Sequence, residues 1–152
     1  MIFILIIITL LLIVSLTVTL SGNTFVHKKF WKEMEKIAKK ENIEVIMHDS
    51  VLLLNKRVYP KEWEQWAKHS PGQLAAGVYS WSRVDISYKK IHLYKKDVWT
   101  FAHELGHHFS IKLINDDSEE AANGFRRTLA LAHMPLWHRM LIPIEMLVYC
   151  KK

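Results

Sequence analysis

The chain has 152 residues, a single cysteine and a formal net charge of +6 at neutral pH, and half of its residues are hydrophobic. This length suits one domain, and one cysteine excludes an internal disulfide framework. The basic balance would suit nucleic-acid binding, but the sequence contains no recognisable nucleic-acid module. Many of the lysines lie within residues 27–40, close to an apolar N-terminal segment. If that segment lies in a membrane, the anionic lipids around it would attract these lysines. We therefore expect a single domain with a short appendage, and we do not expect the protein to bind nucleic acid.

The appendage is the segment formed by residues 2–20, which contains no charged side chain and nothing more polar than Ser and Thr. As a helix it would rise about 28 Å, close to the ~30 Å hydrocarbon thickness of a bilayer. A cleaved signal peptide is the alternative, but the apolar run is longer than usual and the small-residue cleavage pattern is poor. We predict that residues 1–24 form a single transmembrane anchor and that residues 25–152 form the functional domain.

Basic residues follow this segment directly, at Lys28, Lys29 and Lys32, and none precedes it. Because Lys and Arg favour the cytoplasmic side of a membrane, we expect a single-pass membrane protein with its domain in the cytoplasm. Cys150 cannot form an internal disulfide, which agrees with a reducing compartment.

The next elements are short. Residues 25–41 are predicted to form an amphipathic helix, because apolar residues recur on one face at helical spacing. A strand is predicted at residues 43–47, with a further extended stretch at residues 51–54. Pro60 begins a second short helix, which ends at residues 70–72. Residues 77–94 alternate imperfectly between apolar and polar, as in a hairpin or an antiparallel meander.

This strand region has a possible use. An exposed strand edge there, which we place around Ile91, could hold an extended peptide by main-chain hydrogen bonds. Its tyrosines Tyr79, Tyr88 and Tyr94 are candidates for steadying an oxyanion.

Residues 97–109 contain His103-Glu104-Leu105-Gly106-His107. Asp97 can serve as an N-cap and apolar residues recur along one face, so we predict a helix. Residues four apart are separated by about 400° of helical turn, which places His103 and His107 on the same face. Two imidazoles in this arrangement can share one zinc ion, while Glu104 acts as a general base on a water molecule.

A catalytic zinc site of this kind needs a third protein ligand and an open position. Downstream, Ser118 or Asp117 can cap a second helix that carries Glu119 and, one turn later, Asn123. A carboxylate from Glu119 would complete the ligand set. Asn123 could then orient one of the ligands by a hydrogen bond.

The combination of these motifs resembles the ImmA/IrrE family of small zinc-dependent metallopeptidases. The matching positions are His103 to His107, Glu119, Ala122, Asn123, Phe125, Met134 and Pro135. That family is similar to the gluzincins, and its characterised members cleave transcriptional repressors inside bacteria. The resemblance implies that His103, His107 and Glu119 bind Zn2+ and that Glu104 is the general base.

The chain departs from the family pattern in two places. Members usually have a second Glu directly before the Ala of the E-A-N run, whereas Ala121 stands there in this chain and Glu120 is the extra acid. This leaves the choice between Glu119 and Glu120 as third ligand open. The N-terminal apolar segment is the second departure.

The predicted fold is α+β, with a small antiparallel sheet packed on helices and the zinc site between two of the helices. The predicted function is that of a membrane-anchored metalloendopeptidase acting on a protein or peptide substrate, with a transcriptional repressor or another regulator as the candidate. The alternative is a catalytically silent, membrane-anchored binding module on the same fold. An intact Glu104 argues against this alternative, since a binding protein does not need the base. A secreted peptidase would follow if the N-terminal segment were removed.

The remaining histidines are expected to lie on the surface or in ordinary packing: His27, His48, His69, His92 and His138. His108 is turned by about 100° from His107 and cannot share its metal. His133 follows Glu119 by four turns and could approach the cleft.

Overall fold

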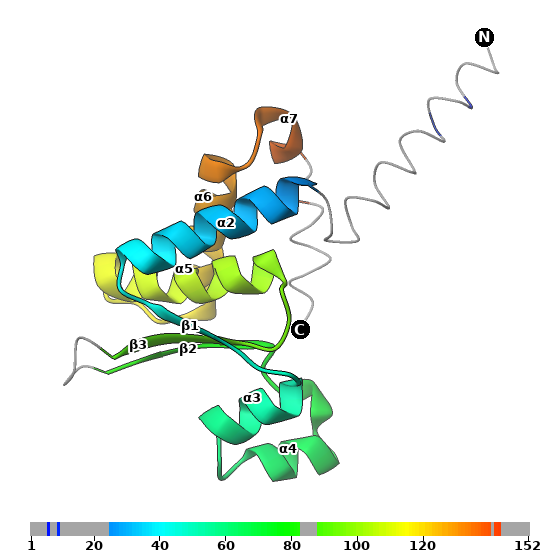
Figure 1. Ribbon diagram of the computed structural model, residues 1–152, viewed down its shortest axis with the longest axis vertical. Coiled ribbons are helices and arrows are strands. Elements are labelled where there is room, and N and C mark those ends of the chain that lie inside the picture. Colours follow the sequence, from blue (N-terminus) through cyan, green and yellow to red (C-terminus); the bar gives the residue numbers. More distant parts are fainter. Residues whose placement is uncertain (1–5, 7–8, 10–24, 83–87, 141, 144–152) are drawn as a thin grey trace.

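The computed structural model describes residues 6, 9, 25–82, 88–140 and 142–143 (Figure 1). No helix among these residues is long and apolar enough to cross a bilayer. The predicted anchor, residues 1–24, lies outside the described residues except for Ile6 and Thr9. The elements, in chain order, are α2 (Phe25–Lys40), β1 (Glu44–Met47), α3 (Val51–Val58), α4 (Trp63–His69), the 3-10 turn η1 (Pro71–Gln73), β2 (Gly77–Trp81), β3 (Lys89–Leu93), α5 (Val98–Ile114), α6 (Glu119–His133) and α7 (Leu136–Arg139).

The predicted α+β class is confirmed, but the expectation of a wholly antiparallel sheet is wrong. The sheet has the order β1-β3-β2. β2 and β3 form the expected antiparallel pair, with Tyr79 opposite Ile91, whereas β1 runs parallel to β3, with Val45 opposite Ile91. The connection from β1 to β3 contains α3, α4 and β2, which is long enough for the chain to return in the original direction.

The strand edge expected around Ile91 is also misplaced. Ile91 lies in the central strand β3 and is fully buried. Among the described residues, β2 is an edge strand of the sheet, because it pairs with β3 and with no other strand.

The extended stretch expected at residues 51–54 is helical instead and forms the first half of α3. Ser50 adopts an extended backbone and its side chain accepts a hydrogen bond from the Leu53 amide, as an N-cap does. Asn55, which is fully buried, donates to the Ala75 carbonyl and accepts from the Ala75 amide. These polar contacts decide the conformation, which the apolar run alone could not.

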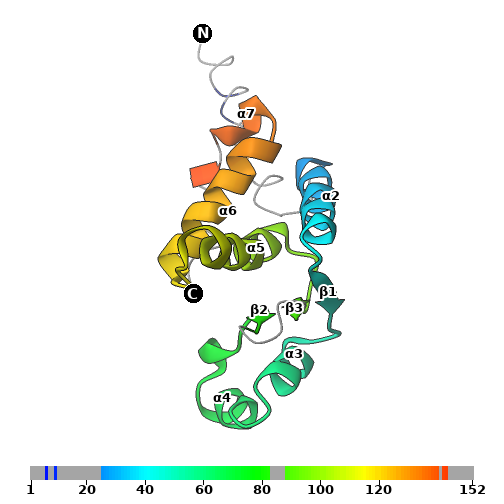
Figure 2. The same ribbon diagram turned by 90° about the vertical axis from the view of Figure 1, so that its left-hand side faces the viewer.

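α5 lies in the middle of the molecule, between the sheet and α2 (Figures 1 and 2). α6 turns back from the end of α5 and runs past α2 toward α7. The core is shared by these layers; its large members include Phe30 and Met34 of α2, Ile91 and Leu93 of β3, and Trp99, Phe101 and Leu105 of α5. The helix that carries His103 and His107 is therefore packed on both sides.

The connection between α5 and α6 is a tight turn formed by residues 115–118. Asn115 ends α5 in the left-handed conformation, with φ of 53°. The Asp116 carboxylate accepts from the Ser118 amide, and the Ser118 hydroxyl oxygen caps α6 by accepting from the Ala121 amide. Of the two expected caps, Ser118 is the one used.

The two helices approach each other most closely at Gly106. A Cβ atom added there would lie 3.0 Å from the Ala122 carbonyl carbon and still closer to its oxygen. Ala122 is itself fully buried. The backbones of α5 and α6 thus meet without an intervening side chain, which brings the first turn of α6 beside the histidines of α5.

We expect Gly106→Ala to lower the free energy of unfolding by about 1–3 kcal/mol, because backbone atoms of α6 must move to admit the methyl group. Gly124→Ala is the matched control, since a Cβ atom there meets nothing within 4 Å. That change should raise stability by about 0.5–1 kcal/mol through the better helix propensity of Ala. Thermal unfolding of the full-length protein in detergent measures both. Equal stabilisation by the two changes would contradict the close contact.

Candidate metal centre

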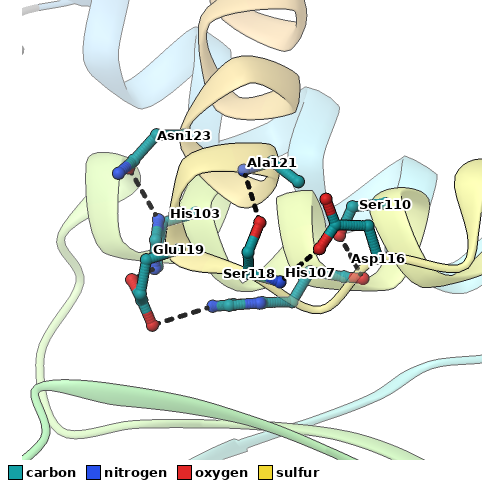
Figure 3. A network of polar contacts seen from close by, with 8 residues as sticks. All are labelled: His103, His107, Ser110, Asp116, Ser118, Glu119, Ala121 and Asn123. Carbon is teal, nitrogen blue, oxygen red and sulfur yellow. Dashed lines mark hydrogen bonds and ion pairs between the residues drawn. The ribbon is translucent and has the colours of Figure 1, made fainter.

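Three of the predicted site residues converge at the junction of α5 and α6 (Figure 3). The Nε2 atoms of His103 and His107 lie 3.0 Å and 3.4 Å from different carboxylate oxygens of Glu119. One possible ligand atom from each residue lies within 4.8 Å of the others. In a tetrahedral zinc site with bonds of about 2.0–2.2 Å, ligand atoms are separated by about 3.4 Å. The separations therefore suit three ligands of one ion.

The hydrogen bond made by Asn123 sets the tautomer of His103. The Asn123 side-chain oxygen lies 3.1 Å from His103 Nδ1, so Nδ1 carries the proton and donates. His103 Nε2 then presents a lone pair to the Glu119 carboxylate, which can also only accept. Two acceptors at hydrogen-bond distance repel each other unless a proton or a cation lies between them. A metal ion satisfies this requirement, and a partner that fixes the imidazole in this way is common at metal sites.

Burial reinforces the neutral state of this imidazole. Burial, together with the neighbouring His107, lowers the pKa of His103 to about 4. The ring is therefore neutral near pH 7, as a metal-ligating imidazole must be.

Glu104 lies beside the three candidate ligands and is almost fully buried. Strand β2 passes close to it at Gly77, where an added Cβ atom would lie 2.9 Å from Glu104 Oε1 and 2.6 Å from Thr100 Cγ2. The strand can thus run directly over the helix because this position has no side chain. This arrangement holds the Glu104 carboxylate between α5 and β2.

These residues line a cavity of about 660 Å³. One wall is formed by α5 and the first turns of α6, and the opposite wall by β2 and the loops around Tyr59 and Ala75. His103, Glu104, His107, Glu119 and Asn123 all face it. Glu120 is not among its lining residues, so the geometry favours Glu119 over Glu120 as a third ligand.

The sequence did not indicate three further lining residues: Gly77, Tyr59 and Arg126. Arg126 follows Asn123 by three residues and Glu119 by seven, so helical periodicity places it on the same face and could have found it. Its side chain is nearly buried. Gly77 and Tyr59 reach the cavity through the tertiary structure and give no local signal.

Tyr79 is the one of the three expected tyrosines that lines the cavity. Its hydroxyl group lies 2.9 Å from His108 Nδ1, and His108 Nε2 lies 3.1 Å from the Glu41 carboxylate. Because a carboxylate can only accept, His108 Nε2 donates to Glu41 and His108 Nδ1 accepts from Tyr79. Burial raises the pKa of Tyr79 to about 12, so the hydroxyl keeps its proton. This group is therefore used in a structural network rather than presented to a ligand.

The remaining histidines lie away from the candidate centre. His108 faces Glu41 and Tyr79 and is not part of the group around Glu119, as expected. His48 and His92 contact each other through ring nitrogens 2.9 Å apart, and His27 packs against His138. The sequence left open that His133 could approach the cleft, but it is not among the residues that line the cavity.

Comparison of the chain with protein-family models, with curated proteins and with solved structures gave no match. The resemblance to the ImmA/IrrE family is thus an interpretation of the motifs alone.

Proposed function

We propose that this protein is a zinc-dependent metalloendopeptidase, held at a membrane by residues 1–24 with its catalytic domain on the cytoplasmic side. One observation supports the peptidase proposal most. Two histidines and a glutamate place ligand atoms within 4.8 Å of one another on the wall of a cavity that also contains Glu104. The lysines that follow the apolar segment support the orientation.

His103, His107 and Glu119 would hold the metal, and His-His-Glu is a ligand set that zinc adopts in catalytic sites. Zinc bound there would polarise the scissile carbonyl group and make a water molecule more acidic. Glu104 accepts the proton of the attacking water and delivers it to the leaving amine. Asn123 keeps the lone pair of His103 Nε2 directed toward the centre by accepting from Nδ1.

Strand β2 offers a way to hold the substrate. It is at the edge of the sheet, and Gly77, Val78, Tyr79 and Trp81 line the cavity. An extended peptide that adds to the free edge of β2 would run across the cavity and pass Glu104, which lies against Gly77. The substrate in this proposal is therefore an extended segment of a protein, and a transcriptional repressor or another regulator is one candidate.

The first experiment measures the metal content of the full-length protein, purified in detergent, by mass spectrometry. We expect one zinc ion per chain, and we expect Glu119→Ala to lose it. Glu120→Ala is the matched control, because its side chain is turned by about 100° along the helix and should leave zinc bound. Loss of zinc from Glu120→Ala alone would place the third ligand one residue later. A folded parent protein without affinity for zinc would refute the proposal.

The second prediction concerns Glu104→Gln. This variant should keep its zinc but cleave a mixture of quenched fluorescent peptides at least about 10²-fold more slowly, because the general base is missing. Glu120→Gln provides the matched control and should be as active as the parent. In cells, proteins that accumulate uncut beside Glu104→Gln identify the substrate. If the zinc-loaded parent and Glu104→Gln were equally inactive on peptides and in cells, the silent binding module would be the better account.

The third prediction tests the role of β2. A cleaved peptide in which each backbone nitrogen is methylated in turn should lose cleavage at alternate positions, because every second amide of an added strand faces its partner. The rates are compared for the complete series of methylated peptides. Binding along the edge of β2 would be contradicted if methylation slowed cleavage equally at every position. It would also be contradicted if methylation slowed cleavage only at the scissile bond.

A further inference from the structure

The domain carries a cluster of exposed apolar side chains at the end formed by α7 and the first turn of α2. We name this cluster the end patch; it consists of Phe25, Leu136, Trp137 and Met140, whose exposed fractions are 81%, 76%, 62% and 79%. Isolated exposed apolar residues are common on soluble surfaces, but a cluster of large ones marks a surface that binds something.

The two elements of the end patch are packed together. The ring of His27 meets the ring of His138 edge to face, with centroids 5.4 Å apart, and both residues are buried. Phe25 lies two residues before His27, and Trp137 lies directly before His138. Figure 1 shows α7 and the first turn of α2 at the same end of the molecule. The first turn of α2 and α7 are therefore neighbours, and the four exposed side chains lie at the same end of the molecule.

The charge beside the end patch is positive. Lys28, Lys29 and Lys32 are exposed on the first turns of α2, and the first turn contains no acidic residue. Large apolar and aromatic side chains beside exposed lysines are the chemistry of a surface that lies in the headgroup region of an anionic membrane. Trp in particular favours this interfacial layer.

The place of the end patch in the sequence indicates that a lipid surface covers it. Residues 2–20 are uncharged and apolar, and only residues 21–24 separate them from Phe25. The five Cα-to-Cα steps from Leu20 to Phe25 span at most about 18 Å, even when the linker is fully extended. The headgroup region on each side of a bilayer is about 5–8 Å thick. If residues 2–20 lie in the hydrocarbon, the start of α2 can therefore lie at most about 10–13 Å beyond the headgroups, and a less extended linker brings it into contact with them.

We propose that the end patch is seated on the headgroup region of an anionic bilayer, so that the domain is docked in one orientation. The proposal depends on the anchor assigned under the proposed function, but not on the peptidase chemistry. α7 and the pair α3 and α4 lie at opposite ends of the domain (Figures 1 and 2), and the cavity lies on the side of α5 that faces β2. A docked domain would thus present its cavity away from the lipid. The substrate class that fits is a protein segment outside the bilayer, either soluble or extending from the membrane surface.

The test uses the full-length chain with Cys150→Ser and a single new cysteine that carries a nitroxide label. Leu136→Cys and Met140→Cys report on the end patch. Leu113→Cys is the matched control, because Leu113 is 62% exposed at the far end of α5. The protein is reconstituted in phosphatidylcholine vesicles with or without about a third phosphatidylglycerol. The accessibility of each label to oxygen and to a water-soluble nickel chelate is then measured.

In the anionic vesicles, we expect accessibility to the nickel chelate to fall several-fold at positions 136 and 140 and accessibility to oxygen to rise, with position 113 unchanged. Replacing Lys28, Lys29 and Lys32 together by Glu should reverse this protection. Vesicle flotation tests the anchor separately. A chain that floats while positions 136 and 140 stay as accessible as position 113 would overturn the docking and leave the anchor intact. Failure to float would overturn both. Protection that disappears at one chain per vesicle would mean that a second copy, and not lipid, covers the surface.

Discussion

The candidate centre depends on one packing contact, the approach of the α5 backbone to the α6 backbone at Gly106 and Ala122. Glu119 lies on the first turn of α6 and must reach two imidazoles on α5 at 3.0 Å and 3.4 Å. A side chain at position 106 would separate the helices at the turn that carries His107, and the carboxylate would leave ligand distance. The glycine within the H-E-x-x-H sequence therefore has a structural role that is distinct from the chemistry of its neighbours.

The same contact creates an electrostatic requirement. The contact between α5 and α6 holds the neutral His103 imidazole against the Glu119 carboxylate. The proton of His103 is on Nδ1, where it is donated to Asn123, so the lone pair of Nε2 faces a carboxylate oxygen. The His103 side chain is 16% exposed and the Glu119 side chain 78% exposed, so the cost of this arrangement falls mainly on the desolvated imidazole, unless a proton or a cation lies between the groups. The geometry thus supports a metal site for a reason that does not depend on motif resemblance. The ligand roles themselves are the proposal that the zinc measurement tests.

Sequence reasoning succeeded where the signals are local and failed where partners are distant in the chain. The helix caps Asp97 and Ser118 and the amphipathic stripe of α2 depend on neighbouring residues, and they predicted α5, α6 and α2 well. The parallel pairing of β1 with β3 depends on a long connection between the two strands, so it could not be predicted from the residues of either strand. The apolar run at residues 51–54 is ambiguous between strand and helix until Ser50 and Asn55 are seen to fix it.

The candidate site shows the same division. Helical spacing alone places His103 with His107 and Glu119 with Asn123, so each half of the site could be predicted from its own helix. The meeting of the two halves required the tertiary contact at Gly106. Residues contributed by the opposite wall, such as Gly77 and Tyr59, were not found, because no local pattern says that β2 crosses the first turns of α5.

Helix α2 and a hydrogen-bonded network at its C-terminal end together connect the end patch to the opposite wall of the cavity. α2 begins at Phe25 in the end patch, and Glu41 follows its last residue. The Glu41 carboxylate accepts from His108 and Lys112 of α5, and His108 accepts from the Tyr79 hydroxyl of β2. Partly buried networks of this kind resist distortion, because each member that lost its partner would cost desolvation energy. A membrane that fixes the direction of α2 would thereby also fix β2, the strand proposed to hold the substrate, relative to its surface.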